Sequence, residues 1–201
     1  KQTGPARLGE HREGIFVGFP VWEAGAAEGG IKYDASIVYP FGYGLSYTTF
    51  TQQMGPVSLA NGKVSFDVTV TNTGDVAGKD VVEAYYNPPY TEGGIEKSAV
   101  NLVAYDKTEL LAPGASQTIT VTFDDDDMAS YDVKNGGAYV LEAGRYDISL
   151  RSDSHTVIDT KPITVDQTIT YNTADSTHDG DLIPATNQFD AAKGEDITYL
   201  S

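Results

Sequence analysis

Few side chains in this 201-residue sequence have the types and spacing that catalysis or metal binding requires. The histidines His11, His155 and His178 are far apart, and no two have the i, i+4 spacing with which one helix face binds a metal. Ser46 follows Gly44 but lacks the second glycine of a nucleophile elbow. The glycines at 42 and 44 precede a predicted strand rather than a helix, so they do not form a nucleotide-binding loop. We therefore expect neither a catalytic residue nor a cofactor in this chain.

A run of four aspartates is the one cluster with metal-binding potential. Calcium prefers several carboxylate oxygens, which this run supplies, although it lacks the sixth-position glycine and final glutamate of an EF-hand. The alternative is an N-terminal cap for a short helical turn over residues 128–131, because carboxylates there accept hydrogen bonds from free N–H groups. We favour the helix cap, since capping needs only one of the four aspartates. The weak metal candidates are Asp124, Asp125, Asp126 and Asp127.

Four aromatic side chains could bind a sugar, because aromatic rings stack on the apolar faces of pyranose rings. In a β-sandwich, the same residue types more often belong to the core or to a seam between domains. We favour core or seam and keep sugar contact as the alternative for Trp22, Tyr85, Tyr86 and Tyr90.

Residues 39–50 read Tyr-Pro-Phe-Gly-Tyr-Gly-Leu-Ser-Tyr-Thr-Thr-Phe and are the most distinctive stretch of the chain. The proline and two glycines exclude a helix, and the segment is too aromatic for an ordinary solvated loop. We predict a tight turn that runs into a strand, with rings that dock against another surface. The expected docking residues are Tyr39, Pro40, Phe41, Tyr43, Leu45, Tyr47 and Phe50.

The composition narrows the classes of partner. A formal net charge of −16 makes binding to nucleic acid or to an anionic membrane unfavourable. The chain has no cysteine, which excludes disulfides and thiolate zinc sites. It also has no apolar run of about 18 residues and no leader pattern. We expect a soluble protein, either cytoplasmic or secreted.

The middle of the chain alternates apolar and polar residues, as strands with one buried face do. The residues at 64, 66, 68 and 70 are apolar, and the run ends in the turn sequence Asn72-Thr73-Gly74-Asp75. Similar alternation surrounds Val121 and Ile148, and residues 80–86 and 101–111 favour strands. Short strands separated by turn signals predict an all-β protein, an antiparallel sandwich of immunoglobulin or fibronectin type III-like architecture.

The two ends of the chain differ from this pattern. Residues 1–37 show no sustained helical period and predict one strand near residue 15 followed by a loop. Beyond residue 165 the chain becomes polar and acidic, which predicts a linker or wrapping arm. We therefore expect a sandwich over residues 50–166 with irregular arms over 1–49 and 167–201.

Residues 39–50 strongly resemble the segment that leads into the C-terminal fibronectin type III-like domain of glycoside hydrolase family 3, the β-glucosidases and their relatives. Residues 13–18 (Glu-Gly-Ile-Phe-Val-Gly) look like the motif that closes the preceding α/β sandwich domain of that family. Supporting similarities lie at residues 68–74, 81–85, 111–114 and 129–132, so the resemblance covers about residues 10–165. The tail, at residues 185–190 and 197–201, is similar to the connector of members in which the catalytic barrel follows this domain.

The resemblance implies a non-catalytic region of a retaining β-glycosidase. Its partners would be the catalytic barrel and α/β sandwich domains of the same enzyme, and a β-glycoside substrate would be reached through that enzyme. The nucleophile and acid/base motifs of the family do not occur here, so no catalytic residue is transferred. A carbohydrate-binding module and a ligand-free adhesion domain are the alternatives.

Overall fold

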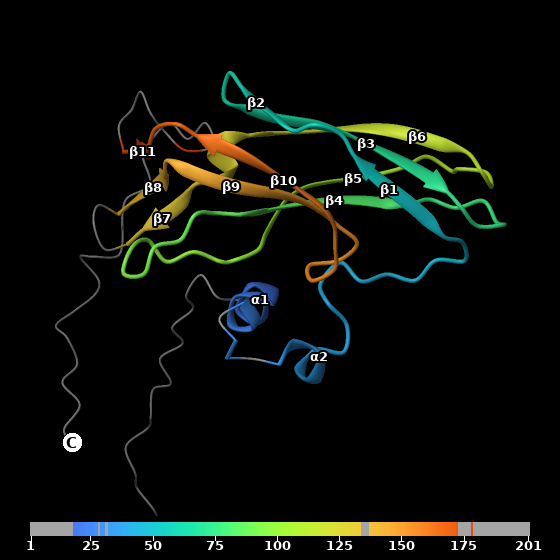
Figure 1. The fold of residues 1–201 in the computed structure, drawn as a ribbon, viewed down its shortest axis with the longest axis horizontal. Helices are drawn as coiled ribbons and strands as arrows, with labels where there is room; N and C mark the ends of the chain where they lie inside the picture. Colours follow the sequence, from blue (N-terminus) through green and yellow to red (C-terminus); the bar gives the residue numbers. More distant parts are fainter. Residues whose placement is uncertain (1–17, 28, 31, 134–136, 173–177, 179–201) are drawn as a thin grey trace, which may run out of the picture.

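The computed structural model describes residues 18–27, 29–30, 32–133, 137–172 and 178. Two antiparallel four-stranded sheets face each other as a sandwich, and a small three-stranded sheet lies at one end (Figure 1). The prediction of an all-β antiparallel sandwich is confirmed. No helix among the described residues is long and apolar enough to cross a membrane.

The first sheet is built around β3 (Lys63–Asn72). β6 (Ser116–Asp124) pairs along one side of β3, while β1 (Phe50–Met54) and β2 (Ser58–Ala60) share the other side. Residues 55–57 interrupt that shared edge, and the Gly55 N–H still donates a hydrogen bond to the Asp67 carbonyl at 2.8 Å.

The second sheet has the order β10 (Val157–Val165), β9 (Gly144–Arg151), β4 (Val81–Asn87) and β5 (Asn101–Lys107). The small sheet consists of β11 (Ile169–Tyr171), β8 (Ala138–Leu141) and β7 (Ser130–Asp132). A 3₁₀ helix, η1 (Asp125–Met128), joins β6 to this small sheet.

The core lies between the two large sheets and follows the alternation of the sequence. On β3, the side chains of Val64, Phe66, Val68 and Val70 are at most 3% exposed. The second sheet contributes residues such as Ile148 to the same cluster. The alternation therefore identified the buried face of β3 and β6, whereas β4 and the end of β9 are buried on both faces.

The expectation of a loop before residue 37 is wrong, because two helices occur there: α1 (Phe19–Ala27) and α2 (Tyr33–Ser36). Pro20 lies in the first turn of α1, where a missing N–H has no effect on the helix, and three alanines favour helix in its second half. Nine residues are too few to show a clear amphipathic period. The strand predicted near residue 15 lies outside the described residues.

The C-terminal arm expected from residue 167 begins with a strand instead. Residues 169–171 form β11, which pairs with β8, and Tyr171 is buried in the main core. Of the remaining tail the structure describes only His178, so the predicted connector lies outside the described residues.

Candidate functional site

Residues 39–50, which we call the aromatic segment, connect α2 to β1 along the outside of the second sheet (Figure 1). The Tyr43 N–H donates a hydrogen bond to the Pro40 carbonyl at 3.1 Å, and Gly42 has φ +86°. A hydrogen-bonded turn with positive φ at its third residue is a type II turn, which needs glycine there. The predicted tight turn is therefore present, and it sends the neighbouring rings outward.

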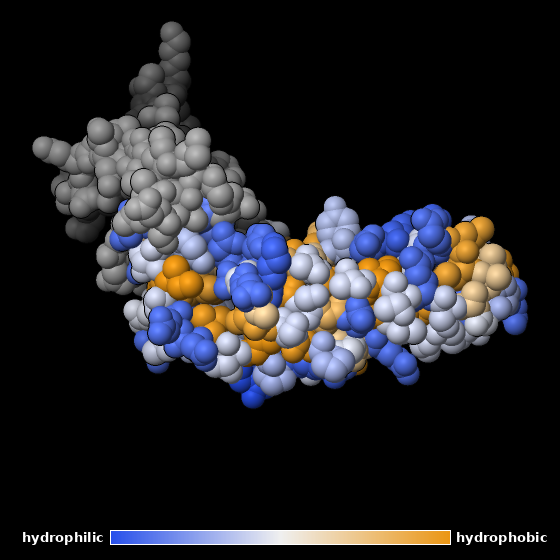
Figure 2. Space-filling view, turned by 90° about the horizontal axis from the view of Figure 1, so that it is seen from above, coloured by the Kyte–Doolittle hydropathy of each residue, from blue (hydrophilic) through white to orange (hydrophobic). Residues whose placement is uncertain are grey.

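Most rings of the aromatic segment are exposed to solvent. The exposed fractions are 69% for Tyr39, 48% for Phe41, 47% for Tyr43, 89% for Leu45 and 100% for Tyr47, and we call these five residues the exposed ridge. By contrast, hydrophobic residues are interspersed with hydrophilic ones on the side of the sandwich away from α1 and α2 (Figure 2).

The ends of the aromatic segment are attached to the sandwich. Near its C-terminal end, the Thr48 hydroxyl donates to Asn72 Oδ1 at 2.8 Å, and half-buried Phe50 packs against the core. Near its N-terminal end, the Phe41 carbonyl accepts a 2.7 Å hydrogen bond from the Ser154 N–H, and the Phe41 ring stacks on Phe19 at 4.5 Å. Phe50 and one face of the Phe41 ring are therefore used in the attachment, and Pro40 forms part of the turn. The remaining exposed surface of the ridge is open to another surface.

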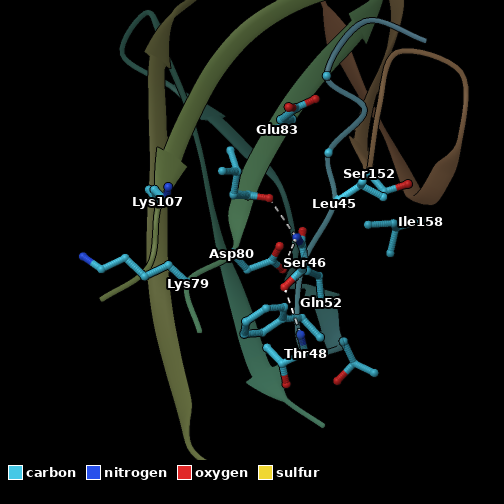
Figure 3. A pocket seen from close by; sticks show the side chains of 15 residues that line it. Leu45, Ser46, Thr48, Gln52, Lys79, Asp80, Glu83, Lys107, Ser152 and Ile158 are labelled. Carbon is cyan, nitrogen blue, oxygen red and sulfur yellow. Dashed lines mark hydrogen bonds between the residues drawn. The ribbon is translucent and has the colours of Figure 1, made fainter. Parts of the chain in front are cut away.

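A groove of about 650 Å³ lies between the aromatic segment and the second sheet. Its labelled side chains come from both walls, with Leu45, Ser46 and Thr48 opposite strand residues (Figure 3). Gln52 Nε2 donates to Asp80 Oδ2 at 2.8 Å and to the Val81 carbonyl at 2.9 Å.

Glu83 on β4 is a carboxyl group of this groove with a raised pKa. Burial raises the pKa of Glu83, and the charges of Asp153 and Asp80 add to that rise, while the hydrogen bond from Tyr85 opposes it. The Tyr85 hydroxyl donates to Glu83 Oε2 at 2.7 Å. A Cβ atom on Gly42 would lie 2.5 Å from the same oxygen, so glycine also permits the close approach of the turn.

The groove does not resemble a reaction site. Asp80 and Glu83 are held by an amide and a phenol, and within the described part of the chain no histidine pairs with either. The residues that the structure describes also contain no group of three His, Asp or Glu side chains placed to hold a metal ion.

The four aromatic side chains considered for sugar contact do not form one platform. Tyr85 and Tyr86 are 0% and 7% exposed, so no ring face is open to a sugar, and the sugar-contact hypothesis is wrong for these two. Tyr86 belongs to the core, and Tyr85 packs edge-on against Phe19 at 6.4 Å. Trp22 on α1 and Tyr90 in the loop after β4 are 39% and 53% exposed.

The aspartate run forms the start of η1, three residues earlier than the turn expected at residues 128–131. The Asp124 N–H donates to Asp127 Oδ2 at 3.1 Å, and Lys63 forms an ion pair with Asp124. Burial raises the pKa of Asp125. The Asp126 carbonyl lies 2.9 Å from His178 Nε2. Capping therefore accounts for Asp124 and Asp127, and the described residues contain no group of three acidic or histidine side chains placed to hold a metal ion.

One cluster was not anticipated from the sequence. Glu23 on α1 meets Ser154 and His155, which are more than 130 positions later in the chain. The Tyr33 ring stacks on the His155 ring at 3.7 Å, with 3° between their planes. Burial raises the pKa of Tyr33 to about 12. No local sequence signal marks these residues, because only the packing of α1 and α2 brings them together.

The chain is similar to a known domain family and to parts of longer proteins. Residues 80–154 match the fibronectin type III-like domain family. The chain is 40% identical to β-glucosidase A of Butyrivibrio fibrisolvens over 158 residues, which cover 68% of this chain and 18% of that protein. It is 35% identical to a β-glucosidase of Ruminococcus albus over 166 residues, 79% of this chain and 16% of that one.

Solved structures show the same relationship. β-Glucosidase 3B of Thermotoga neapolitana, in complex with α-D-glucose, superposes with a TM-score of 0.67 at 31% identity, over 78% of this chain and 20% of that chain. The β-glucosidase of Kluyveromyces marxianus, in complex with glucose, superposes with a TM-score of 0.68 at 28% identity, over 78% of this chain and 18% of that chain. The chain thus spans less than a fifth of the length of these curated relatives.

Proposed function

We propose that this chain, which contains the fibronectin type III-like domain of family 3 glycoside hydrolases, is a non-catalytic region of a β-glucosidase-like enzyme. In this role it stabilises the catalytic domains by docking against them and contributes to the shape of the substrate entrance. The partners are the catalytic barrel and the α/β sandwich domain of the same enzyme, which would act on β-glycosides.

The exposed ridge is the observation that carries this proposal. Taking about 200 Å² for each ring, its four rings expose roughly 500 Å². The largest apolar patch of an ordinary monomer is about 300–600 Å², and patches of that size often serve a function. The turn at Gly42 and the attachments of Phe41 and Thr48 hold these rings outward, which is costly in water unless another surface covers them.

The length of the relatives supports the same proposal. The matched β-glucosidases are five to six times longer than the segment they share with this chain, so they contain other domains for such a surface to meet. The described residues supply a groove and a ridge but no nucleophile with a base. A docking region is therefore a better description than a small independent hydrolase.

Two measurements on the 201-residue chain test the proposal. The chain should not hydrolyse an aryl β-glucoside, and turnover that survives controls for contaminating enzyme would overturn the non-catalytic assignment. It should also bind a dye that fluoresces on apolar surface, and the triple variant Tyr39→Ser, Tyr43→Ser, Tyr47→Ser should bind much less.

The matched control is Tyr105→Ser, because Tyr105 is 73% exposed on β5, outside the ridge. Tyr105→Ser should leave most of the dye signal in place. A weak signal in the unmodified chain, or an equal loss in Tyr105→Ser and the triple variant, would contradict a docking role for the ridge.

A carbohydrate-binding module remains the rival proposal, carried by the exposure of Trp22 and Tyr90. Titration calorimetry with cellobiose distinguishes the two. Heat of binding that disappears in Trp22→Ala or Tyr90→Ala would favour the binding module, whereas docking through the ridge predicts none.

A further inference from the structure

Helices α1 and α2 are attached to the sandwich by a buried polar cluster at the loop between β9 and β10, residues 152–156. The Glu23 side chain is 4% exposed and uses both carboxylate oxygens. Ser154 Oγ donates to Glu23 Oε1 at 2.9 Å, and His155 Nδ1 lies 3.0 Å from Glu23 Oε2. A buried carboxylate needs such partners, because removing them leaves a charge without compensation.

Ser154 connects this cluster to the aromatic segment. It is 0% exposed, and its N–H donates to the Phe41 carbonyl at 2.7 Å. Its own carbonyl accepts a 2.7 Å hydrogen bond from Arg151 Nη1. The loop is held in shape by Asp153, whose Oδ1 accepts from the N–H groups of His155 at 2.9 Å and Thr156 at 2.7 Å.

Aromatic contacts complete the attachment. Tyr33 of α2 stacks on His155, and Phe19 of α1 stacks on Phe41. Of the side chains described on α1 and α2, Glu23 and Tyr33 are the buried ones. The attachment of both helices therefore depends on the few residues that meet at this loop.

The sandwich does not need the helices for its own core. The main hydrophobic cluster of buried residues begins at Met54 and includes none of the side chains described on α1 and α2. Helices of nine and four residues are also too short to persist alone in water, where about 12–15 residues are marginal. Elements with few buried contacts open more readily than the core strands do.

We propose that Glu23, Tyr33, Ser154 and His155 form a latch that holds α1 and α2 against the β9–β10 loop and thereby fixes the direction of the exposed ridge. Opening the latch releases the helices and the start of the aromatic segment while the sandwich remains folded. The latch itself does not depend on the proposed function, but its role in presenting the ridge to a partner domain rests on it.

Backbone hydrogen exchange of the full chain, followed by mass spectrometry, tests the latch. In Glu23→Ala, amides of residues 19–36 should exchange about tenfold faster, while those of residues 64–70 on β3 keep their rates. Alanine favours helix more than glutamate does, so weaker local helix propensity cannot explain faster exchange. Trp22, the single tryptophan, gives a second readout, since acrylamide should quench its fluorescence more strongly.

Asp34→Ala is the matched control, because Asp34 is an exposed carboxylate on α2 outside the latch. Ser154→Ala should reproduce the effect of Glu23→Ala from the opposite side of the contact. Unchanged exchange of residues 19–36 in both latch variants would overturn the proposal, as would equal acceleration in the helices and in β3. The measurement needs no partner domain, so a failed docking role would appear in the dye experiment instead.

Discussion

Asn72 is the side chain whose replacement should cost the sandwich most among its buried polar groups. It is 0% exposed and makes four side-chain hydrogen bonds. Its Oδ1 accepts from the Thr48 hydroxyl at 2.8 Å and the Gly74 N–H at 3.1 Å, and its Nδ2 donates to the carbonyls of Val76 at 2.8 Å and Leu111 at 2.9 Å. One amide thus joins the aromatic segment, the turn after β3 and the chain before β6.

We expect Asn72→Ala to lower the free energy of unfolding by about 3 kcal/mol. Each buried hydrogen bond contributes roughly 0.5–1.5 kcal/mol net, and four of them are lost together. The Leu111 carbonyl keeps a second donor in the Gly78 N–H, which moderates the loss. Urea unfolding at 25 °C, with an unchanged dependence on denaturant, measures this difference.

The variant Asn72→Asp tests whether the two hydrogen bonds donated by the Asn72 amide are the cause of this loss of stability. The aspartate keeps the size of the side chain but directs a carboxylate oxygen at the carbonyls of Val76 and Leu111 in place of a donor. At pH 7 it should therefore cost more than Asn72→Ala, and the excess should shrink at acidic pH, where protonation restores a donor.

Asn101→Ala is the control, because Asn101 Nδ2 makes a single side-chain bond, to the Ser98 carbonyl at 3.0 Å. Its loss should cost about 1 kcal/mol. A cost below about 1 kcal/mol for Asn72→Ala, or an Asn72→Asp penalty that does not change with pH, would refute this reasoning.

Three further outcomes are expected. Burial raises the pKa of Glu83, so the ionised side chain disfavours folding, and this penalty develops as the pH rises from the ordinary pKa of glutamate through the raised one. Glu83→Gln should therefore be more stable than the unmodified chain at neutral pH and equally stable at strongly acidic pH. Thermal melts at a series of pH values measure this difference. Gly74→Ala should lower stability by about 1–3 kcal/mol in urea unfolding, because its Cβ would lie 2.3 Å from Thr48 Oγ1 and 2.8 Å from the Thr49 nitrogen; an unchanged midpoint would contradict the tight packing of the segment. In an ultraviolet titration of phenolate, burial should delay ionisation of Tyr146 to about pH 12, and Tyr146→Phe should reduce the late step by one tyrosine, since Tyr33 also ionises late.

β3 and β6 could be predicted because each of them buries a single face. The alternation at Val64, Phe66, Val68 and Val70 is a local signal that needs no knowledge of the partner strand. The Pro40 to Tyr43 turn was equally local, since glycine at position 42 adopts the positive φ that this turn requires.

The burial of side chains that the sequence did not predict depends on contacts between distant parts of the chain. Tyr85 lies on the outer face of its sheet, where alternation predicts exposure, yet Phe19 and Arg151 cover its ring. Glu23 is an ordinary helix residue until Ser154 and His155 meet it. Burial of an outer-face aromatic and of a lone carboxylate both follow from the placement of α1, which no short window of sequence contains.

The interruption between β1 and β2 makes it harder for a second chain to add a strand to this edge of the first sheet. A long unpaired strand at the edge of a sheet offers a continuous row of N–H and C=O groups on which another chain can assemble. Here that edge is divided at residues 55–57, where Pro56 has no N–H and the Gly55 N–H is already used within the sheet. Neither remaining piece exceeds five residues, so this edge of the first sheet is a poorer template for self-association than the opposite edge, the nine-residue β6.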